Sequence, residues 1–142
     1  KGTIPAGKVY SHPVISLDIM GTITELAGVK IAEERPLDGV NLIPYLTGKN
    51  EGAPHDQLFW RKLEKQGMCI RNGDTKLVAN TQRHKNSYQL FNVEKDLSET
   101  KNLRKQSPEK SKELLEAWEA WNDQLKDRIF PTLMDDKWWE RL

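Results

Sequence analysis

The stretch from residue 57 to residue 93 decides the fold, and it reads QLFWRKLEKQGMCIRNGDTKLVANTQRHKNSYQLFNV. It contains four short apolar runs, QLFWRKL, GMCIRN, DTKLVANT and SYQLFNV. Asn72-Gly73 joins the two middle runs, and this dipeptide is the strongest short-range signal for a two-residue β-hairpin. We therefore expect a small antiparallel sheet with strands over 58–63, 68–71, 75–79 and 88–93.

A long helix is predicted after this sheet, beginning at Ser107-Pro108 and ended by Pro131. Its apolar residues recur at helical spacing, and they are Leu114, Leu115, Trp118, Trp121 (or Asn122 in its place), Leu125 and Ile129. At ~1.5 Å per residue the helix would be about 30 Å long, enough to cross a four-stranded sheet. Trp118 is the expected anchor, because a Trp side chain buries ~150–250 Å². The expected fold class is α+β, a four-stranded antiparallel sheet covered by a long C-terminal helix.

The part before the sheet has a different character. Residues 14–28, VISLDIMGTITELAG, predict a helix that Ser16 can cap and Gly28 can end, with apolar residues most of the way round. Such a helix is expected to be buried on more than one side. Gly21 inside it costs about 1 kcal/mol relative to Ala, so packing must decide its place. A short helical turn is expected over 42–46, before Gly48.

Charge and composition exclude several classes of partner. The 142 residues carry 22 basic and 21 acidic side chains, a net charge of +1, and the basic residues are spread along the chain. This distribution argues against nucleic acid and against a polybasic membrane anchor as partners. No apolar run approaches the ~20 residues that span a bilayer. The single cysteine, Cys69, excludes an intrachain disulfide and a zinc site built on several cysteines.

Few residues suggest chemistry by themselves. Cys69 lies within an apolar strand, where an inert buried thiol is the expected state. The histidines His12, His55 and His84 all fall in predicted loops, without the mutual spacing of a metal site. Four cations lie on or beside the sheet and, paired with Trp60, could meet an anionic or sugar-like ligand: Arg61, Lys62, Arg71 and Lys76. The alternative, charged side chains extending from a half-exposed sheet to solvent, remains equally open.

The order of the motifs resembles the C-terminal portion of the type I sulfatases, within the alkaline-phosphatase-like superfamily. The matching segments are IPAG (4–7), HPVISLDI (12–19), DIMGT and LAG (within 18–28), RPLDGV (35–40), LFWR (58–61), IRNGDTKL (70–77), QLFNV (89–93), then Asp96, Glu99, Asn102, Leu103 and Pro108-Glu109. Each motif is weak alone, but the ordered set is strong. Gly21 and Leu97 stand where the family usually has proline, and both departures concern turns and helix starts.

The resemblance implies a parent protein that is a sulfuric ester hydrolase, acting on a sulfated carbohydrate or an aryl sulfate. Members of the family use a formylglycine, made from a Cys or Ser in a Cys/Ser-x-Pro-x-Arg motif, and a Ca²⁺ that polarises the sulfate. Cys69 is followed by Ile70 and Arg71, so it does not match that motif. The resemblance therefore places the nucleophile and all metal ligands upstream of Lys1, and the chain alone is expected to be inactive. It also implies a periplasmic, extracellular or lysosomal location.

In this interpretation residues 1–51 are the end of the large α/β domain and a connecting segment, and residues 52–142 are the C-terminal α+β subdomain. The resemblance suggests His55, Trp60, Arg61 and Arg71 as substrate-binding residues, and it implies no catalytic residue within the chain. The expected partners are the upstream catalytic domain and a sulfated small molecule or glycan. Two alternatives stay open: a stand-alone module that binds anionic glycans or acts as a scaffold, and a phosphoesterase of the same superfamily.

Overall fold

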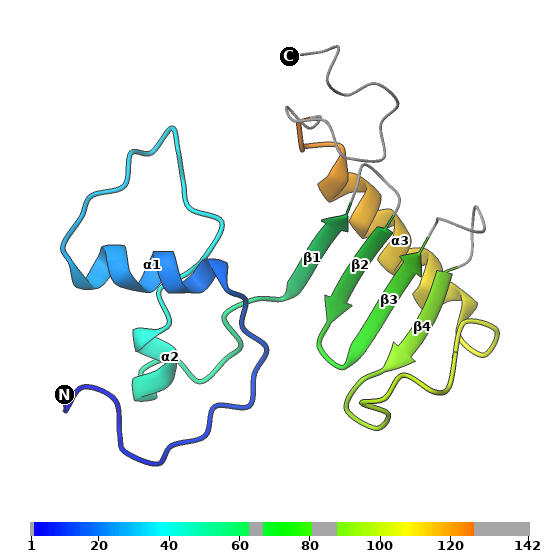
Figure 1. Cartoon of the computed structure of the whole chain (residues 1–142), viewed down its shortest axis with the longest axis horizontal. Coiled ribbons are helices and arrows are strands. Elements are labelled where there is room, and N and C mark those ends of the chain that lie inside the picture. The colour runs from blue at the N-terminus through cyan, green and yellow to red at the C-terminus, as the bar shows by residue number, and fades with distance from the viewer. Residues whose placement is uncertain (1, 63–66, 81–87, 127–142) are drawn as a thin grey trace, which may run out of the picture. The chain divides into compact units, whose positions relative to one another are not determined.

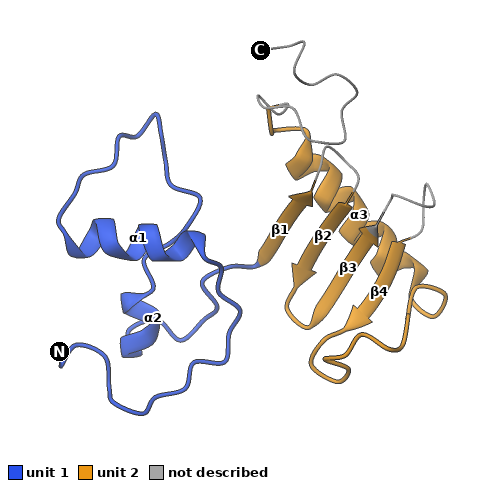
Figure 2. Ribbon diagram, in the orientation of Figure 1, with its two compact units in different colours: residues 1–56 blue, residues 57–142 orange. Residues whose placement is uncertain are grey.

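The computed structural model describes residues 2–62, 67–80 and 88–126. The chain divides into two compact units, unit 1 with residues 1–56 and unit 2 with residues 57–142 (Figure 2). Each unit is described by itself below. No helix among the described residues is both long enough and apolar enough to cross a membrane.

Unit 2 contains the predicted sheet. Its elements are β1 (Gln57–Lys62), β2 (Gly67–Asn72), β3 (Thr75–Asn80), β4 (Tyr88–Asn92) and α3 (Pro108–Asn122). The strands pair in the order β1-β2-β3-β4, all antiparallel, and α3 lies across one face of the sheet (Figure 1). The predicted α+β class is confirmed, because the four strands form one antiparallel sheet and α3 packs against it.

The hairpin between β2 and β3 differs from the prediction by one position. Asn72 pairs with Thr75, so the two central residues are Gly73 and Asp74 rather than Asn72 and Gly73. Gly73 has a φ of 55°, whereas Asp74 is not among the residues with positive φ. Glycine at the first central position, followed by a residue of negative φ, is the pattern of a type II′ turn, whose twist matches the strands. Asn72 thereby remains in the strand ladder.

The core of unit 2 lies between the sheet and α3. Because side chains alternate along a strand, one set of residues from β2, β3 and β4 meets the helix: Met68, Ile70, Leu77, Ala79 and Leu90. Leu114 and Trp118 fill the helix side of this core. The Trp118 Nε1–H also donates a hydrogen bond of 3.1 Å to the Trp60 carbonyl, so the indole is anchored at both ends. Trp118 is therefore the helix–sheet anchor that the sequence predicted.

Helix α3 is shorter than predicted. It ends at Asn122, and not at Pro131, because the next amides form i→i−3 bonds that tighten the chain into a turn. The Gln124 N–H donates to the Trp121 carbonyl, and the Leu125 N–H donates to that of Asn122. The predicted continuation through Ile129 and Pro131 lies outside the described residues. Ser107 is at the N-cap position, but its side chain forms no capping hydrogen bond.

Two helices belong to unit 1, α1 (Leu17–Leu26) and α2 (Ile43–Thr47). The predicted role of Gly28 and Gly48 at the C-terminal ends of these helices is confirmed. Both glycines are left-handed, with φ values of 67° and 84°. Helix α1 is buried only at Asp18 and Gly21. Its apolar side chains are largely exposed within this chain, with Ile19 at 61%, so its predicted burial on several sides is not found here.

The packing of unit 1 explains why residue 21 is a glycine. A Cβ at this position would lie 2.8 Å from backbone atoms of Gly39 and Val40, and a Cβ on Gly39 would overlap the backbone of Leu17. Both glycines therefore allow the segment around residue 39 to pass directly against α1. This close approach outweighs the intrinsic cost of glycine inside a helix.

Candidate functional site

Strand alternation separates the predicted binding residues of the sheet. Arg61 lies on the face that α3 covers, because its Nη2 donates to the Lys126 carbonyl at 2.9 Å and its Nη1 to Asn122 Oδ1 at 3.4 Å. Trp60 precedes it on β1 and therefore points to the opposite face, where 41% of its surface is exposed. Arg61 thus fixes the end of α3 and does not join Trp60.

Arg71 shares the face of Trp60. Cys69 is the cross-strand partner of Trp60, and Arg71 follows Cys69 by two residues, so all three point away from α3. Trp60 and Arg71 are diagonal neighbours, a relation that typically separates Cα atoms by ~7–8 Å and lies within reach of long side chains. We call this side of the sheet, with Trp60, Cys69, Arg71 and Lys76, the helix-free face.

Positive charge gathers along one row of the helix-free face. Arg71 is the cross-strand partner of Lys76. Lys76 forms an ion pair of 2.5 Å with Glu99, which comes from the connection between β4 and α3. The Arg71 Nε–H donates to the Gly73 carbonyl at 2.8 Å, and this bond orients the guanidinium near the hairpin. The row can therefore offer an anion one oriented guanidinium beside a partly neutralised ammonium.

Cys69 has no nucleophilic character in this setting. Burial raises the pKa of its thiol, and Glu99 raises it further. Lys76 and Arg71 lower the pKa, but they do not outweigh the burial. A thiol with a raised pKa stays protonated at neutral pH and reacts slowly. The structure thus supports the interpretation of Cys69 as an inert cysteine.

His55 belongs to unit 1 and forms a buried contact with Asp18. Its Nε2 lies 2.8 Å from Asp18 Oδ1 and 2.9 Å from Oδ2. The Asp18 side chain is fully buried, and that of His55 is 12% exposed. His55 therefore holds the segment before β1 to the first turn of α1, so only its Nδ1 edge is left for another partner.

Asp18 is the hub of unit 1. Its carboxylate also accepts the Ile15 N–H at 2.9 Å and the Val40 N–H at 3.0 Å. Burial alone would raise the pKa of this carboxyl, but the two backbone donors and His55 together hold the pKa below its ordinary value. Asp18 is ionised at neutral pH and joins three separate segments.

Sequence reasoning missed the roles of Asp18 and Glu99. Lys76 was among the cations predicted for the sheet, and the pairing of β2 with β3 places it opposite Arg71. Asp18 showed only its place in a first helical turn, which is explained equally well by the helix dipole. Nothing in the sequence indicated that Glu99 pairs with Lys76, because this contact depends on the path of the irregular connection between β4 and α3.

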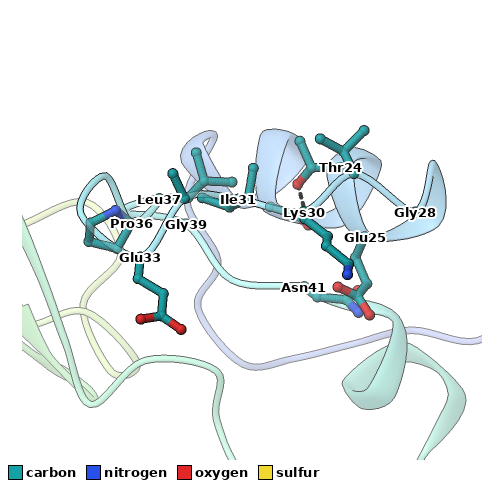
Figure 3. A pocket seen from close by; sticks show the side chains of 13 residues that line it. Thr24, Glu25, Gly28, Lys30, Ile31, Glu33, Pro36, Leu37, Gly39 and Asn41 are labelled. Carbon is teal, nitrogen blue, oxygen red and sulfur yellow. Dashed lines mark hydrogen bonds between the residues drawn. The ribbon is translucent and has the colours of Figure 1, made fainter.

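A hollow of about 690 Å³ lies in unit 1 between α1 and the segment that returns past it. Glu25, Lys30 and Asn41 extend toward one another at one end, and Glu33 lies at the other (Figure 3). Among the described residues no group of three or more His, Cys, Asp or Glu side chains could hold a metal ion. The carboxylate of Asp18 already accepts hydrogen bonds from three donors, so Asp18 is not a free ligand for a cation.

The chain was compared with known proteins. No family model matches it. It is similar to human arylsulfatase D, with 34% identity over 58 residues, which are 41% of this chain and 10% of that protein. It is also similar to human steryl-sulfatase, with 39% identity over 56 residues, 39% of this chain and 10% of that protein. The predicted resemblance to the sulfatases is confirmed. This sulfatase-like chain spans about a tenth of the length of the curated relatives it matches.

Solved structures extend the similarity beyond the matched segment. The crystal structure of Ps i-CgsB in complex with k-i-k-neocarrahexaose aligns with a TM-score of 0.69 and 31% identity, over 84% of this chain and 26% of that one. A structure described as a 2-O GAG sulfatase gives a TM-score of 0.53 and 28% identity, over 75% of this chain and 23% of that one. The phosphonate monoester hydrolase of Agrobacterium radiobacter, at 23% identity and a TM-score of 0.53 over 75% of this chain and 24% of that one, shares the fold alone. The sulfatase-like chain therefore corresponds to about a quarter of these larger molecules.

Proposed function

We propose that this chain is the C-terminal part of a sulfuric ester hydrolase that acts on a sulfated carbohydrate or an aryl sulfate. The observation that carries the proposal is its identity of 34–39% with two human sulfatases over the segment they share. The solved structures add a 2-O GAG sulfatase at 28% identity and a protein in complex with k-i-k-neocarrahexaose at 31% identity. The chain by itself supplies support and substrate contacts rather than the reacting groups.

The chemistry would belong to the upstream part of the parent protein. There a formylglycine hydrate would supply the nucleophile, and a Ca²⁺ would supply Lewis-acid polarisation of the sulfate. Asp18, whose carboxylate is held by three donors, and Cys69, which lacks the formylglycine motif, are not the residues that would hold or form these groups. We therefore derive no catalytic step from them.

Helix α1 supports the proposal of an upstream catalytic domain. Its exposed apolar side chains are Leu17, Ile19, Met20, Ile23 and Leu26. A helix that exposes apolar residues on most of its surface needs further partners to bury them. We propose the large catalytic domain as this partner, because the relatives that share the segment are about ten times longer than the match.

Substrate contacts are assigned to the helix-free face, with Trp60 and Arg71 as the binding residues. Arg71 can pair with a sulfate group, and Trp60 can stack on a sugar ring or an aryl group. His55 can reach a substrate only through its Nδ1 edge, because its Nε2 is held by Asp18. Arg61 would act indirectly, by fixing the end of α3.

The proposal is tested with 4-nitrophenyl sulfate and 4-nitrophenyl phosphate on the full-length parent and on this chain. We expect sulfate hydrolysis by the parent, weak or no phosphate hydrolysis, and no turnover by the chain alone. Preference of the parent for the phosphate ester would favour the phosphoesterase alternative. Turnover by the chain alone would refute the upstream location of the reacting groups.

A second function, a non-catalytic module that binds anionic glycans, is favoured by one observation. Trp60 is 41% exposed and lies on the same face as Arg71, an arrangement suited to an acidic sugar. The matched variants are Arg71→Gln on the helix-free face and Lys101→Gln at an exposed position elsewhere. If the isolated chain binds a sulfated glycan and only Arg71→Gln weakens it, while the parent shows no hydrolysis, the module is the correct function.

A further inference from the structure

A hollow of about 410 Å³ lies beside the N-terminal half of α3. We call it the α3 hollow. Tyr88, which lines it, is the cross-strand partner of the core residue Ala79 and so points away from the helix-free face. Its lining combines residues with apolar surface, the serine Ser111 and three cations. We call Tyr88, Pro108 and Leu115 the floor, and Arg104, Lys105 and Lys112 the rim. Its volume falls within the ~300–1,000 Å³ range of small-molecule sites.

The positive charge of the rim comes from two parts of the chain. Arg104 and Lys105 belong to the turn before α3, and Lys112 belongs to the helix. The Arg104 guanidinium lies 5.5 Å from the centre of the Tyr88 ring and donates to the Tyr88 carbonyl, so one cation is held in place. Lys105 and Lys112 are exposed and can move toward a ligand.

No acidic residue is among the described residues that line the α3 hollow. Glu116 approaches Lys112 at 3.8 Å, but both side chains are well exposed and the pair competes weakly with a ligand. A second hollow of about 310 Å³ continues along the helix, sharing Tyr88 and Leu115, and it carries Glu119 and Asp123. The charge of the described lining residues thus differs between the two hollows, and of the two the α3 hollow suits an anion.

We propose that the α3 hollow binds a sulfated segment of an oligosaccharide, as a second contact remote from the helix-free face. A sugar ring offers an apolar C–H face to the floor and sulfate groups to the rim, which is the combination that the hollow provides. A ligand that is only anionic would leave the apolar floor unused. The proposal rests on the proposed function for the choice of a sulfated glycan as ligand.

Binding to the full 142-residue chain is measured by calorimetry and by amide chemical shifts, with three probes. The probes are a heparin-derived tetrasaccharide, the same tetrasaccharide after desulfation, and sodium sulfate. The test variant is Lys105→Gln with Lys112→Gln. The matched control is Lys95→Gln with Lys101→Gln, which removes the same charge from exposed positions of unit 2.

We expect the sulfated tetrasaccharide to shift the amides of Ser111 and Leu115, and the desulfated one to leave them unchanged. The test variant should weaken binding at least fivefold, and the control less than twofold. Equal weakening by both variants would mean unspecific charge attraction and would refute the site. Equal affinity for sodium sulfate would refute the glycan assignment. The binding experiment involves no turnover, so it is independent of the hydrolysis assay. A parent protein that fails to hydrolyse the sulfate ester would refute the proposed function and leave the binding result unaffected.

Discussion

Replacing Asp18 with alanine removes one acceptor from three donors in unit 1. The donors are the Ile15 and Val40 amides and the His55 ring, at 2.8–3.0 Å. Each buried backbone donor left without a partner costs ~1–3 kcal/mol, and hydrogen bonds to a charged group contribute ~1.5–3 kcal/mol. Because these terms are not additive, we expect a total loss of about 3–5 kcal/mol in the free energy of local opening, less than the sum of the separate terms.

Hydrogen exchange followed by mass spectrometry measures this loss in peptides that contain Val40, at neutral pH. His55→Ala should cost less than Asp18→Ala, because the two backbone donors keep their acceptor. Asp38→Ala removes an exposed carboxylate from the neighbouring turn and should leave exchange unchanged. Peptides from the sheet of unit 2 serve as an internal reference. An equal effect of Asp18→Ala and Asp38→Ala would refute the assignment of Asp18 as the hub.

The same contact has a pH dependence of defined sign. The pKa of Asp18 is lowered in the folded chain from its ordinary value of 3.8, so folding favours the ionised form. Its contribution is fully present above the unfolded-state pKa and is lost as the pH falls through the folded-state pKa. Exchange of the Val40 amide should therefore accelerate below about pH 4 beyond its intrinsic rate. If the Asp18→Ala variant keeps this acid sensitivity, another group is responsible.

Three further predictions concern the packing of Gly39 and Leu114 and the reactivity of Cys69. Gly39→Ala should destabilise unit 1 by about 1–3 kcal/mol in exchange experiments, because its Cβ would overlap the backbone of Leu17; unchanged protection would show that the segment can move away. Leu114→Ala should lower the urea midpoint of unit 2 by the equivalent of about 2–5 kcal/mol, because the side chain is fully buried; a loss below 1 kcal/mol would contradict the described core. Cys69 should react slowly with a disulfide reagent in the native chain and rapidly in urea; rapid native labelling would contradict its raised pKa.

The sheet could be predicted from sequence, because its determinants are local. Apolar runs of strand length, a dipeptide typical of hairpins and a Trp at helical spacing each act within a few residues. The turn was misplaced by one position because Asn-Gly and Gly-Asp centres overlap in this sequence, and only the pairing of Asn72 with Thr75 decides between them. The end of α3 was missed because Pro131 gives a clear stop signal, whereas the turn after Asn122 arises from i→i−3 hydrogen bonds.

The candidate site was less predictable, since it depends on contacts between distant segments. Strand alternation places Arg61 and Trp60 on opposite faces of the sheet. Their adjacency in the sequence nevertheless suggested that both would contact the same ligand. His55 resembled a solvated loop histidine, and nothing near it in sequence indicates Asp18, 37 residues away. The sequence indicated that packing must explain the glycine at position 21. The structure supplies the explanation, because the segment around Gly39 passes directly against the helix there.

The strand order of unit 2 has a consequence for how the protein forms. Each strand pairs with its neighbour in the sequence, so the sheet is a meander whose contacts close short loops. Short loop closures cost little chain entropy and are associated with fast folding. Among the described elements of unit 2, the return of α3 onto β1, β2 and β3 needs the longer closures. The sheet is thus expected to assemble from its own residues, without the proposed catalytic domain as a template.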